Sequence, residues 1–186
     1  MEIVTKEEFE QRFDEFMKRI LDGQIFIYGT DTIYGIGCDA TNGKAVAKLR
    51  GIKGRHKGPF SIIAPSKGWI EANCGSSEEL DKLPGPYTII MKLRNKDSIA
   101  DEVNPGRKTL GVRIPNHWFS AVAEEIGVPI VTTSVNKKDE PFMTSVEDID
   151  EDIENHVDFM INEGQISGRP STLIDLTKKK KKVTKR

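Results

Sequence analysis

The spacing of apolar residues near the N-terminus predicts an amphipathic helix. Thr5 and Glu8 stand three residues apart, which is the pattern of a capping box at the start of a helix. The apolar residues that follow recur every three or four positions, at Phe9, Phe13, Phe16, Met17 and Ile20. This is the period of a helix with one buried face. We expect the helix to end at Gly23, because glycine commonly closes a helix C-terminus.

Short apolar runs bounded by glycine, proline and polar residues predict strands along the rest of the chain. Seven such runs lie at 25–28, 60–64, 87–93, 109–115, 129–136, 157–161 and 171–176. Helical patterns predict a helix from Asn42 to Arg50, short helices capped by Ser66 and by Ser76 or Ser77, a helix that Asn116 caps and Gly127 ends, and an acidic helix at 145–156. We expect residues 29–41, which are rich in glycine, threonine and aspartate, to form a loop.

Strands and helices alternate without an internal repeat or a low-complexity linker before residue 178. This predicts an α/β fold, a single-domain twisted mixed sheet with flanking helices, over residues 1–177. Two short helices, rather than one long crossover, separate the runs at 60–64 and 87–93, which favours a mixed sheet over a simple doubly wound one. Residues 178–186 form a basic C-terminal tail that can add a final strand.

The charge of the chain is unevenly distributed. The formal net charge is −1, but the tail from Lys178 to Arg186 contains seven basic residues and no acidic ones. The rest of the chain carries 21 basic and 29 acidic side chains, a net charge of about −8. We therefore expect a basic cluster within this acidic body to face an anion.

The same composition excludes several classes of protein. Cys38 and Cys74 form no CxxC motif, and His56, His117 and His156 are scattered singly, so we expect no metal site. The acidic N-terminus is unlike a signal peptide, and no apolar run approaches the roughly 18 residues of a membrane span. We therefore expect a cytoplasmic protein. The chain also lacks the P-loop, dinucleotide-binding, nucleophile-elbow and kinase motifs.

Two groups of cations are candidates for chemistry. Lys53, Arg55 and Lys57 lie within five residues, between a predicted helix and a predicted strand. They either form a solvated helix end that complements the helix dipole or bind an anion. Arg113 stands inside an apolar strand, where an arginine is costly unless it is paired. Its guanidinium therefore either makes a structural ion pair or clamps a ligand carboxylate.

Hydroxyl and amide side chains follow two other predicted strands. Thr30, Asp31 and Thr32 stand among glycines that let a backbone approach a ligand, although the segment can equally be a connection with Asx turns. Ser134 and Asn136 end an apolar strand, and the period of two sends both side chains to the same side. They either converge on one ligand group or form an ordinary turn.

The motifs TDTIYGIG, KGR, PGPYT, GVRIP, TSVN and STLID occur in this order from Thr30 to Asp175. The series resembles the catalytic domain of the YrdC-like threonylcarbamoyl-AMP synthase family, as a single-domain YrdC/YciO-type member. The resemblance implies a twisted sheet around a large basic cleft. It also implies a nucleotidyltransferase that condenses L-threonine, bicarbonate and ATP to threonylcarbamoyl-AMP and pyrophosphate, with Mg2+ accompanying ATP. The threonylcarbamoyl group would then pass to tRNA through a partner complex.

The same resemblance implies the site residues, position by position. ATP would be bound by Lys53, Arg55, Gly58, Thr109, Ser134, Asn136, Thr144 and Arg186. Lys53 and Arg55 would be the catalytic pair on the phosphates. L-Threonine would be bound by Thr32, Arg113 and Ser171, with Arg113 on the carboxylate. The resemblance implies no metal ligand from the protein, and it leaves direct contact with tRNA or double-stranded RNA open.

The chain departs from the family pattern in the segments that carry the site. Gly29 and His56 stand where the family usually has proline, and the segment from Arg55 to Pro59 is one residue shorter than the common form. Two other functions fit the same fold: a non-catalytic RNA-binding module and a paralogous carbamoyl-handling enzyme. The retained K-x-R and S-x-N patterns favour the synthase.

Overall fold

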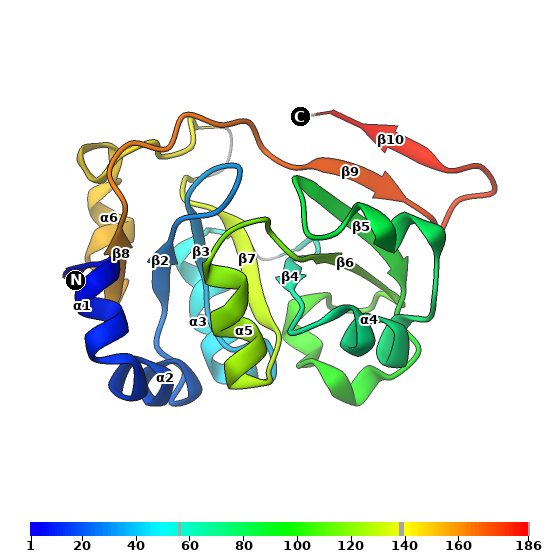
Figure 1. Cartoon of the computed structure of the whole chain (residues 1–186), viewed down its shortest axis with the longest axis horizontal. Helices are drawn as coiled ribbons and strands as arrows, with labels where there is room; N and C mark the ends of the chain where they lie inside the picture. The colour runs from blue at the N-terminus through cyan, green and yellow to red at the C-terminus, as the bar shows by residue number, and fades with distance from the viewer. Residues whose placement is uncertain (56, 138–139, 186) are drawn as a thin grey trace.

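The predicted strands join in one mixed sheet in the computed structural model, which describes residues 1–55, 57–137 and 140–185. Ten strands lie in the order β1-β8-β2-β3-β7-β4-β6-β5-β9-β10 (Figure 1). In that order, their bounds are Glu2–Thr5, Phe159–Asn162, Phe26–Tyr28, Gly35–Gly37, Ile130–Ser134, Ser61–Ile63, Thr109–Arg113, Tyr87–Lys92, Thr172–Asp175 and Lys182–Thr184. Parallel and antiparallel pairs both occur, so the predicted mixed α/β sheet with flanking helices is confirmed.

Strand pairing brings distant segments together at the middle of the sheet. β3 and β7 are antiparallel, and Gly35 lies opposite Ser134. β4 pairs with β7 on one side and with β6 on the other, where Ile63 lies beside Arg113. The polar ends of strands that are far apart in the sequence therefore meet across a few strand spacings.

Three helices cover one face of the sheet. They are α1 (Lys6–Gln11), α2 (Phe13–Leu21) and α5 (Phe119–Ile126). Their aromatic side chains pack on β2 and β8, where the rings of Phe26 and Phe159 stack with centroids 5.1 Å apart. The rings of Tyr28 and Phe119 lie closer still, at 4.1 Å. Such stacked rings add to the hydrophobic gain of burying them.

Helix α3 (Gly43–Ile52) covers the opposite face, behind the sheet in Figure 1. Val46 and Leu49 pack in the same core as Ile27, whereas Phe26 and Tyr28 belong to the core on the other face. This division follows from the alternation of side chains along a strand. The remaining helical segments are α4 (Lys67–Cys74), α6 (Glu151–Glu154) and the 3-10 turns η1 (Glu78–Lys82), η2 (Lys96–Ser98), η3 (Asp101–Val103) and η4 (Val146–Asp148). No helix within the described ranges is long and apolar enough to cross a membrane.

The N-terminal helix is confirmed together with its capping box, but it is divided. Thr5 Oγ1 accepts a hydrogen bond from the Glu8 amide at 3.1 Å, and the Glu8 carboxylate accepts one from the Thr5 amide at 2.8 Å. Arg12 leaves the helical region, with φ −111° and ψ 30°, and separates α1 from α2. The apolar spacing therefore predicts the buried face correctly but does not reveal the break.

Three other expectations are wrong. Residues 145–156 form η4 and α6 rather than one helix, because the Asp150 carboxylate caps a new start by accepting from the Asp152 and Ile153 amides. Asn116 does not cap α5, which begins at Phe119. The segment 29–41 is not only a loop, because it contains the strand β3. The sheet of the described residues has ten strands instead of seven, since β1, β3 and β10 join the seven predicted strands. β3 has a single apolar residue, Ile36, between two glycines, and β1 runs directly into the capping box of α1, so neither stands out as a bounded apolar run.

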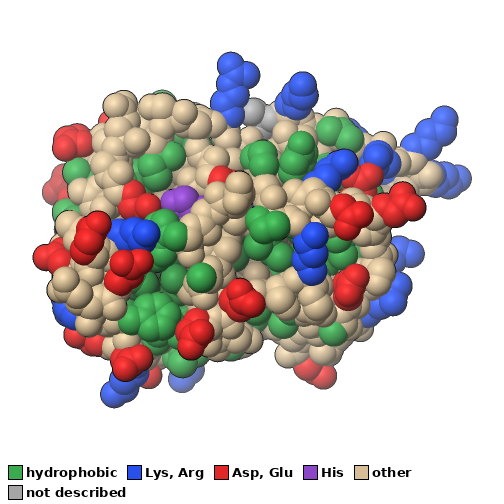
Figure 2. Space-filling view, viewed as in Figure 1, with side chains coloured by type: hydrophobic (Ala, Val, Ile, Leu, Met, Phe, Trp, Pro, Cys, Tyr) green, Lys and Arg blue, Asp and Glu red, His purple; other side chains and the backbone are tan. Residues whose placement is uncertain are grey.

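The C-terminal lysines extend the sheet at one edge. β10 pairs antiparallel with β9, and Lys and Arg side chains project from this end of the molecule in Figure 2. Lys181 contacts Glu79 at 2.5 Å, while the apolar side chain of Val183 is exposed. Lysines on an edge strand disfavour pairing with a further strand.

Candidate active site

The polar ends of the central strands surround a cavity of about 380 Å³. Its walls include five of the predicted ligand residues: Arg55, Arg113, Ser134, Asn136 and Ser171. Arg55 follows α3, and Arg113 ends β6. Ser134 and Asn136 lie at the end of β7, and Ser171 directly precedes β9. A concave site with few, convergent polar groups is the usual form of a small-molecule site.

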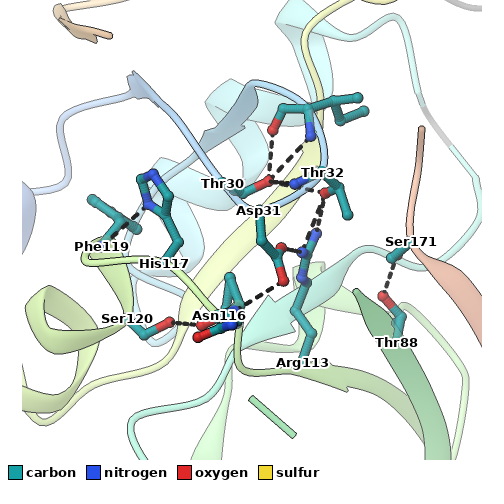
Figure 3. A network of polar contacts seen from close by, with 12 residues as sticks. Thr30, Asp31, Thr32, Thr88, Arg113, Asn116, His117, Phe119, Ser120 and Ser171 are labelled. Atoms are coloured by element: carbon teal, nitrogen blue, oxygen red, sulfur yellow. Dashed lines mark hydrogen bonds and ion pairs between the residues drawn. The ribbon is translucent and has the colours of Figure 1, made fainter. Parts of the chain in front are cut away.

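Arg113 lies at one end of this cavity and is held by the loop after β2 (Figure 3). Its Nη2 donates to Asp31 Oδ1 at 2.6 Å and to Thr32 Oγ1 at 3.2 Å. The other Asp31 oxygen accepts from the Asn116 amide at 2.9 Å. Asp31 thus connects β6 to the loop, and the structural ion pair considered from the sequence exists.

The ion pair does not use the whole guanidinium. Arg113 is 6% exposed, and its Nε has no hydrogen-bond partner among the described residues. Burial lowers the pKa of Arg113, and the neighbouring Asp31 carboxylate opposes that shift. Arg113 thus lines the cavity with one buried donor, Nε, left without a partner, and such a group usually marks a place where a partner is missing.

Thr30 organises the loop that holds Arg113. Its hydroxyl donates to the Ile33 carbonyl at 2.7 Å and accepts from the amides of Thr32 and Ile33. The hydroxyls of Thr30 and Thr32 are 2.9 Å apart. These bonds form a compact hydroxyl-bonded turn, so the turn interpretation of this segment is correct locally. The turn nevertheless lines the cavity through Thr30.

Lys53 is joined to the end of β7 at the other side of the cavity. Its Nζ donates to the Ser134 carbonyl at 2.6 Å, to Asn136 Oδ1 at 3.2 Å and to the Asn136 carbonyl. Ser134 Oγ donates to the same Asn136 Oδ1 at 2.6 Å. Ser134 and Asn136 therefore converge as their spacing predicts, and the ammonium stabilises that arrangement.

Lys53 is not part of a solvated helix end, because it is only 7% exposed. Burial, assisted by the charge of Arg55, lowers the pKa of Lys53 to about 8. Arg55 is half-buried and lies over the Phe60 ring, 5.3 Å from its centroid. Burial lowers the pKa of Arg55 as well.

Arg55 joins the cavity to a neighbouring one of about 590 Å³. Lys53, Arg55, Lys57 and Lys137 all line this second cavity, which also reaches Ser134 and Asn136. Four cationic side chains around one cavity produce a positive electrostatic potential, which favours binding of a polyanion such as a triphosphate.

Ser171 closes the first cavity beside Arg113. Its hydroxyl lies 2.7 Å from the Thr88 hydroxyl, and both side chains are buried on the cavity wall. The segment before Ser171 passes directly against the Thr30 loop: a Cβ added to Gly168 would lie 1.6 Å from the Thr32 carbonyl oxygen. Only glycine allows this close approach of two backbones.

Among the predicted ligand residues that the structure describes, neither cavity is lined by Thr32, Gly58, Thr109 or Thr144. Thr109 begins β6 and lines a different cavity, at the opposite end of the strand from Arg113. The Thr144 hydroxyl donates to Asp148 at 2.7 Å. Gly58 adjoins Arg55 and has φ +98°. Arg186 and His56 lie outside the described residues. The ligand roles of these positions stay predictions.

Two residues of the site were missed from the sequence. Thr88 contacts Ser171 from the adjacent strand β5, and Arg50 is buried at 8% exposure beneath the loop that carries Arg55. Arg50 stands four residues after Val46, on the apolar face of α3. That position could have identified it as buried. No cluster of three or more potential metal-ligating side chains occurs in the described part of the chain.

The chain matches a known family over almost its whole length. The model of the Sua5/YciO/YrdC family, described as "Telomere recombination", covers residues 18–186. A Methanocaldococcus jannaschii protein named "Putative threonylcarbamoyl-AMP synthase" is 39% identical over 178 residues, which cover 91% of this chain and 83% of the relative. A Vibrio campbellii protein named threonylcarbamoyl-AMP synthase is 29% identical over 177 residues, covering 89% and 94% of the two chains.

A solved structure shows the same fold in a longer protein. The crystal structure of P. abyssi Sua5 complexed with L-threonine superposes with a TM-score of 0.82 at 26% identity. It covers 98% of this chain, but this chain spans only 55% of that protein. The likeness therefore concerns the part of that protein that corresponds to the sheet and its cavity.

Proposed function

Since the chain belongs to the Sua5/YciO/YrdC family, we propose that it is a threonylcarbamoyl-AMP synthase acting on L-threonine, bicarbonate and ATP. The threonine amine and bicarbonate form a carbamate with loss of water. A carbamate oxygen then attacks the α-phosphorus of ATP, which forms a C–O–P anhydride and expels pyrophosphate. The enzyme is thus a nucleotidyltransferase.

Arg113 is the proposed ligand of the threonine carboxylate. Its unpartnered Nε faces buried surroundings, and Asp31 and Thr32 fix the plane of the guanidinium. A fixed guanidinium fork suits a carboxylate, which accepts two parallel hydrogen bonds. The Thr32 and Ser171 hydroxyls are the proposed polar contacts for the rest of the amino acid. The complex of the P. abyssi relative with L-threonine supports threonine as the amino-acid ligand.

The second cavity is the proposed place of the ATP phosphates. Lys53 and Arg55 supply positive charge where pyrophosphate leaves, and Ser134 and Asn136 lie between the two cavities. The substrate nucleotide is MgATP, in which phosphate oxygens and water hold most of the Mg2+ coordination sites. Preorganised cations lower the barrier because they stabilise charge that develops in the transition state.

The observation that carries this proposal is the meeting of two sites at Arg55, Ser134 and Asn136. These residues line both cavities, and one cavity contains the buried Arg113 while the other contains four cations. An amino acid and a nucleotide can therefore lie with their reactive groups adjacent. A non-catalytic RNA-binding module would instead favour an open basic surface with stacking side chains. A paralogous carbamoyl-handling enzyme remains the alternative that the experiment below tests.

The product determines the partners that the proposal requires. Threonylcarbamoyl-AMP is an activated acyl donor, and its threonylcarbamoyl group would pass to a tRNA adenosine through a partner complex. We place this reaction in the cytoplasm. The basic edge formed by β10 is the proposed region for any direct contact with tRNA, because lysines bind phosphate irrespective of sequence.

The test is threonine-dependent release of pyrophosphate. Purified protein with MgATP and bicarbonate should release pyrophosphate only when L-threonine is present, and mass spectrometry should detect threonylcarbamoyl-AMP. Arg55→Ala should lower turnover at least about 100-fold, by analogy with loss of an oxyanion donor. The matched control is Lys44→Ala, which removes an exposed cation from α3, the helix that precedes Arg55. Equal release of pyrophosphate without threonine would contradict the proposal.

A further inference from the structure

The guanidinium of Arg50 is buried under the loop that carries Arg55, and it is bonded to four backbone carbonyls. Its Nη1 donates to the Arg55 carbonyl at 2.9 Å, and its Nη2 donates to the Gly58 carbonyl at 2.9 Å. Its Nε donates to Glu102 at 2.5 Å, and Nη2 also donates to Val103 at 3.0 Å. The side chain thus joins both ends of the loop to η3.

We infer that Arg50 is a positioning residue for the nucleotide: it fixes the backbone at Arg55 and at Gly58 so that Arg55 faces the ATP phosphates. This inference rests on the proposed function, in which Arg55 contacts those phosphates. Arg50 itself lines neither of the two cavities that form the site. Its effect therefore passes through the backbone of the loop.

The loop depends on Arg50 because little else in its own sequence restrains it. Gly54 and Gly58 both have positive φ, at +57° and +98°, and no proline lies between them. The backbone carbonyl of Arg50 also accepts a hydrogen bond from the Arg55 amide at 2.9 Å. Arg50 therefore bonds both backbone groups of Arg55, its N–H and its carbonyl. Glycine positions populate many conformations unless contacts select one.

Phe60 restrains the same two guanidinium groups. The Arg50 guanidinium lies 4.6 Å from the centroid of the Phe60 ring, and that of Arg55 lies 5.3 Å from it. The Phe60 amide donates to the Val103 carbonyl, the same oxygen that accepts from Arg50. Arg50, Phe60 and η3 therefore form one rigid base on which the loop and Arg55 rest.

A role limited to stability does not explain a cation in this place. Arg50 is 8% exposed, and no ion pair joins it to a carboxylate within the described ranges. Burial and, to a smaller extent, the charge of Arg55 lower its pKa, while the charge of Glu102 opposes that shift. Burying a charge is costly, and an apolar side chain of similar volume is often as stable. What an apolar side chain cannot do is bind four carbonyls. A lysine cannot do so either, because it has three donors and no planar fork.

The variant that tests this is Arg50→Lys, which keeps the charge and loses the fork. We expect the KM for ATP to rise at least about tenfold, the KM for L-threonine to stay within about twofold, and Tm to fall. The matched control is Arg19→Lys. Arg19 is also partly buried, bonded to Glu2 at 2.6 Å and to Gln24 at 2.7 Å, but it lies in α2, away from the loop. It should lower Tm and leave both KM values unchanged.

An unchanged KM for ATP in Arg50→Lys, or an equal rise in Arg19→Lys, overturns the inference. If Arg50→Lys does not fold, Phe60→Leu decides, because it removes the ring on which the guanidinium groups of Arg50 and Arg55 rest, and Phe60 lines neither cavity. It should raise the KM for ATP alone, and an unchanged value overturns the inference. If the wild-type protein releases no threonine-dependent pyrophosphate, the proposed function fails. Calorimetric binding of MgATP then decides: about tenfold weaker binding to Arg50→Lys supports positioning, and equal binding overturns it.

Discussion

Phosphate binding should weaken as pH rises through 8, because Lys53 titrates there. Burial and Arg55 lower the pKa of Lys53 to about 8, whereas its ordinary value is 10.5. In the free protein, about nine tenths of Lys53 is charged at pH 7 and about one tenth at pH 9. If only the ammonium form binds the phosphates, apparent affinity falls in proportion to that fraction. We therefore expect about tenfold weaker binding of MgATP at pH 9 than at pH 7.

Calorimetry of MgATP binding between pH 7 and 9 measures this effect. Repeating the titration in two buffers of different ionisation enthalpy should show uptake of a proton near pH 8.5. Lys53→Met should bind more weakly at pH 7 and should lose the pH dependence. The control Lys44→Met replaces an exposed lysine of α3, the helix that ends just before Lys53, and this variant should keep the pH dependence. An affinity that stays constant across the range in the wild-type protein would refute the reasoning.

The same group makes a signed prediction for stability. The pKa of Lys53 is lower in the folded protein than its ordinary value, so the unfolded chain binds more protons between about pH 8 and 10.5. The free energy of unfolding should therefore increase as pH rises through that interval, and Lys53 should contribute roughly 3 kcal/mol to the increase. Urea unfolding of the wild-type protein minus that of Lys53→Met isolates the contribution. A difference that does not change with pH would contradict the assignment.

Three further substitutions separate threonine binding from stability. Arg113→Lys should raise the KM for L-threonine at least about tenfold and leave MgATP binding unchanged, because the guanidinium fork is lost; a proportional loss in both would contradict this. Asp31→Asn should lower the free energy of unfolding by about 3–5 kcal/mol in urea at pH 7, because it leaves the buried Arg113 without its counter-charge, and a loss below about 1 kcal/mol would argue against a buried pair. Gly168→Ala should lower Tm by several degrees in a thermal melt, since its Cβ would overlap the Thr32 carbonyl; an unchanged melt would show that the segment moves freely.

The fold could be predicted from the sequence where elements are long or strongly patterned. The N-terminal helix, α3 and the apolar strands β5, β6 and β7 all follow from hydrophobic period. β1 and β3 do not, because β1 runs directly into the capping box of α1 and β3 has one apolar residue between two glycines. The break in the acidic segment depends on Asp150 bonding to the backbone, a local competition that composition alone does not resolve.

The candidate site could be predicted to a similar extent. The spacing of Ser134 and Asn136 predicts that their side chains lie on the same side, which the structure confirms. For Arg113 the sequence predicts either an ion pair or a carboxylate clamp, and the structure shows that the ion pair exists. The sequence does not reveal that Thr88 and Arg50 contribute to the site, although the position of Arg50 on the apolar face of α3 indicates that it is buried. Each acts through a contact with a residue far away in sequence or with backbone carbonyls, and side-chain type alone does not encode such partners.

The residues that line the first cavity are far apart in the sequence, and this separation affects how the protein folds. The walls begin at Thr30 and end at Leu173, and β1 pairs with β8, so that Glu2 lies beside Phe159. Contacts between segments so far apart require closure of long loops, which makes folding slow relative to that of a helical bundle. The cavity that contains Arg113 is therefore complete only when β9 has joined the sheet, because its walls combine residues from both halves of the chain.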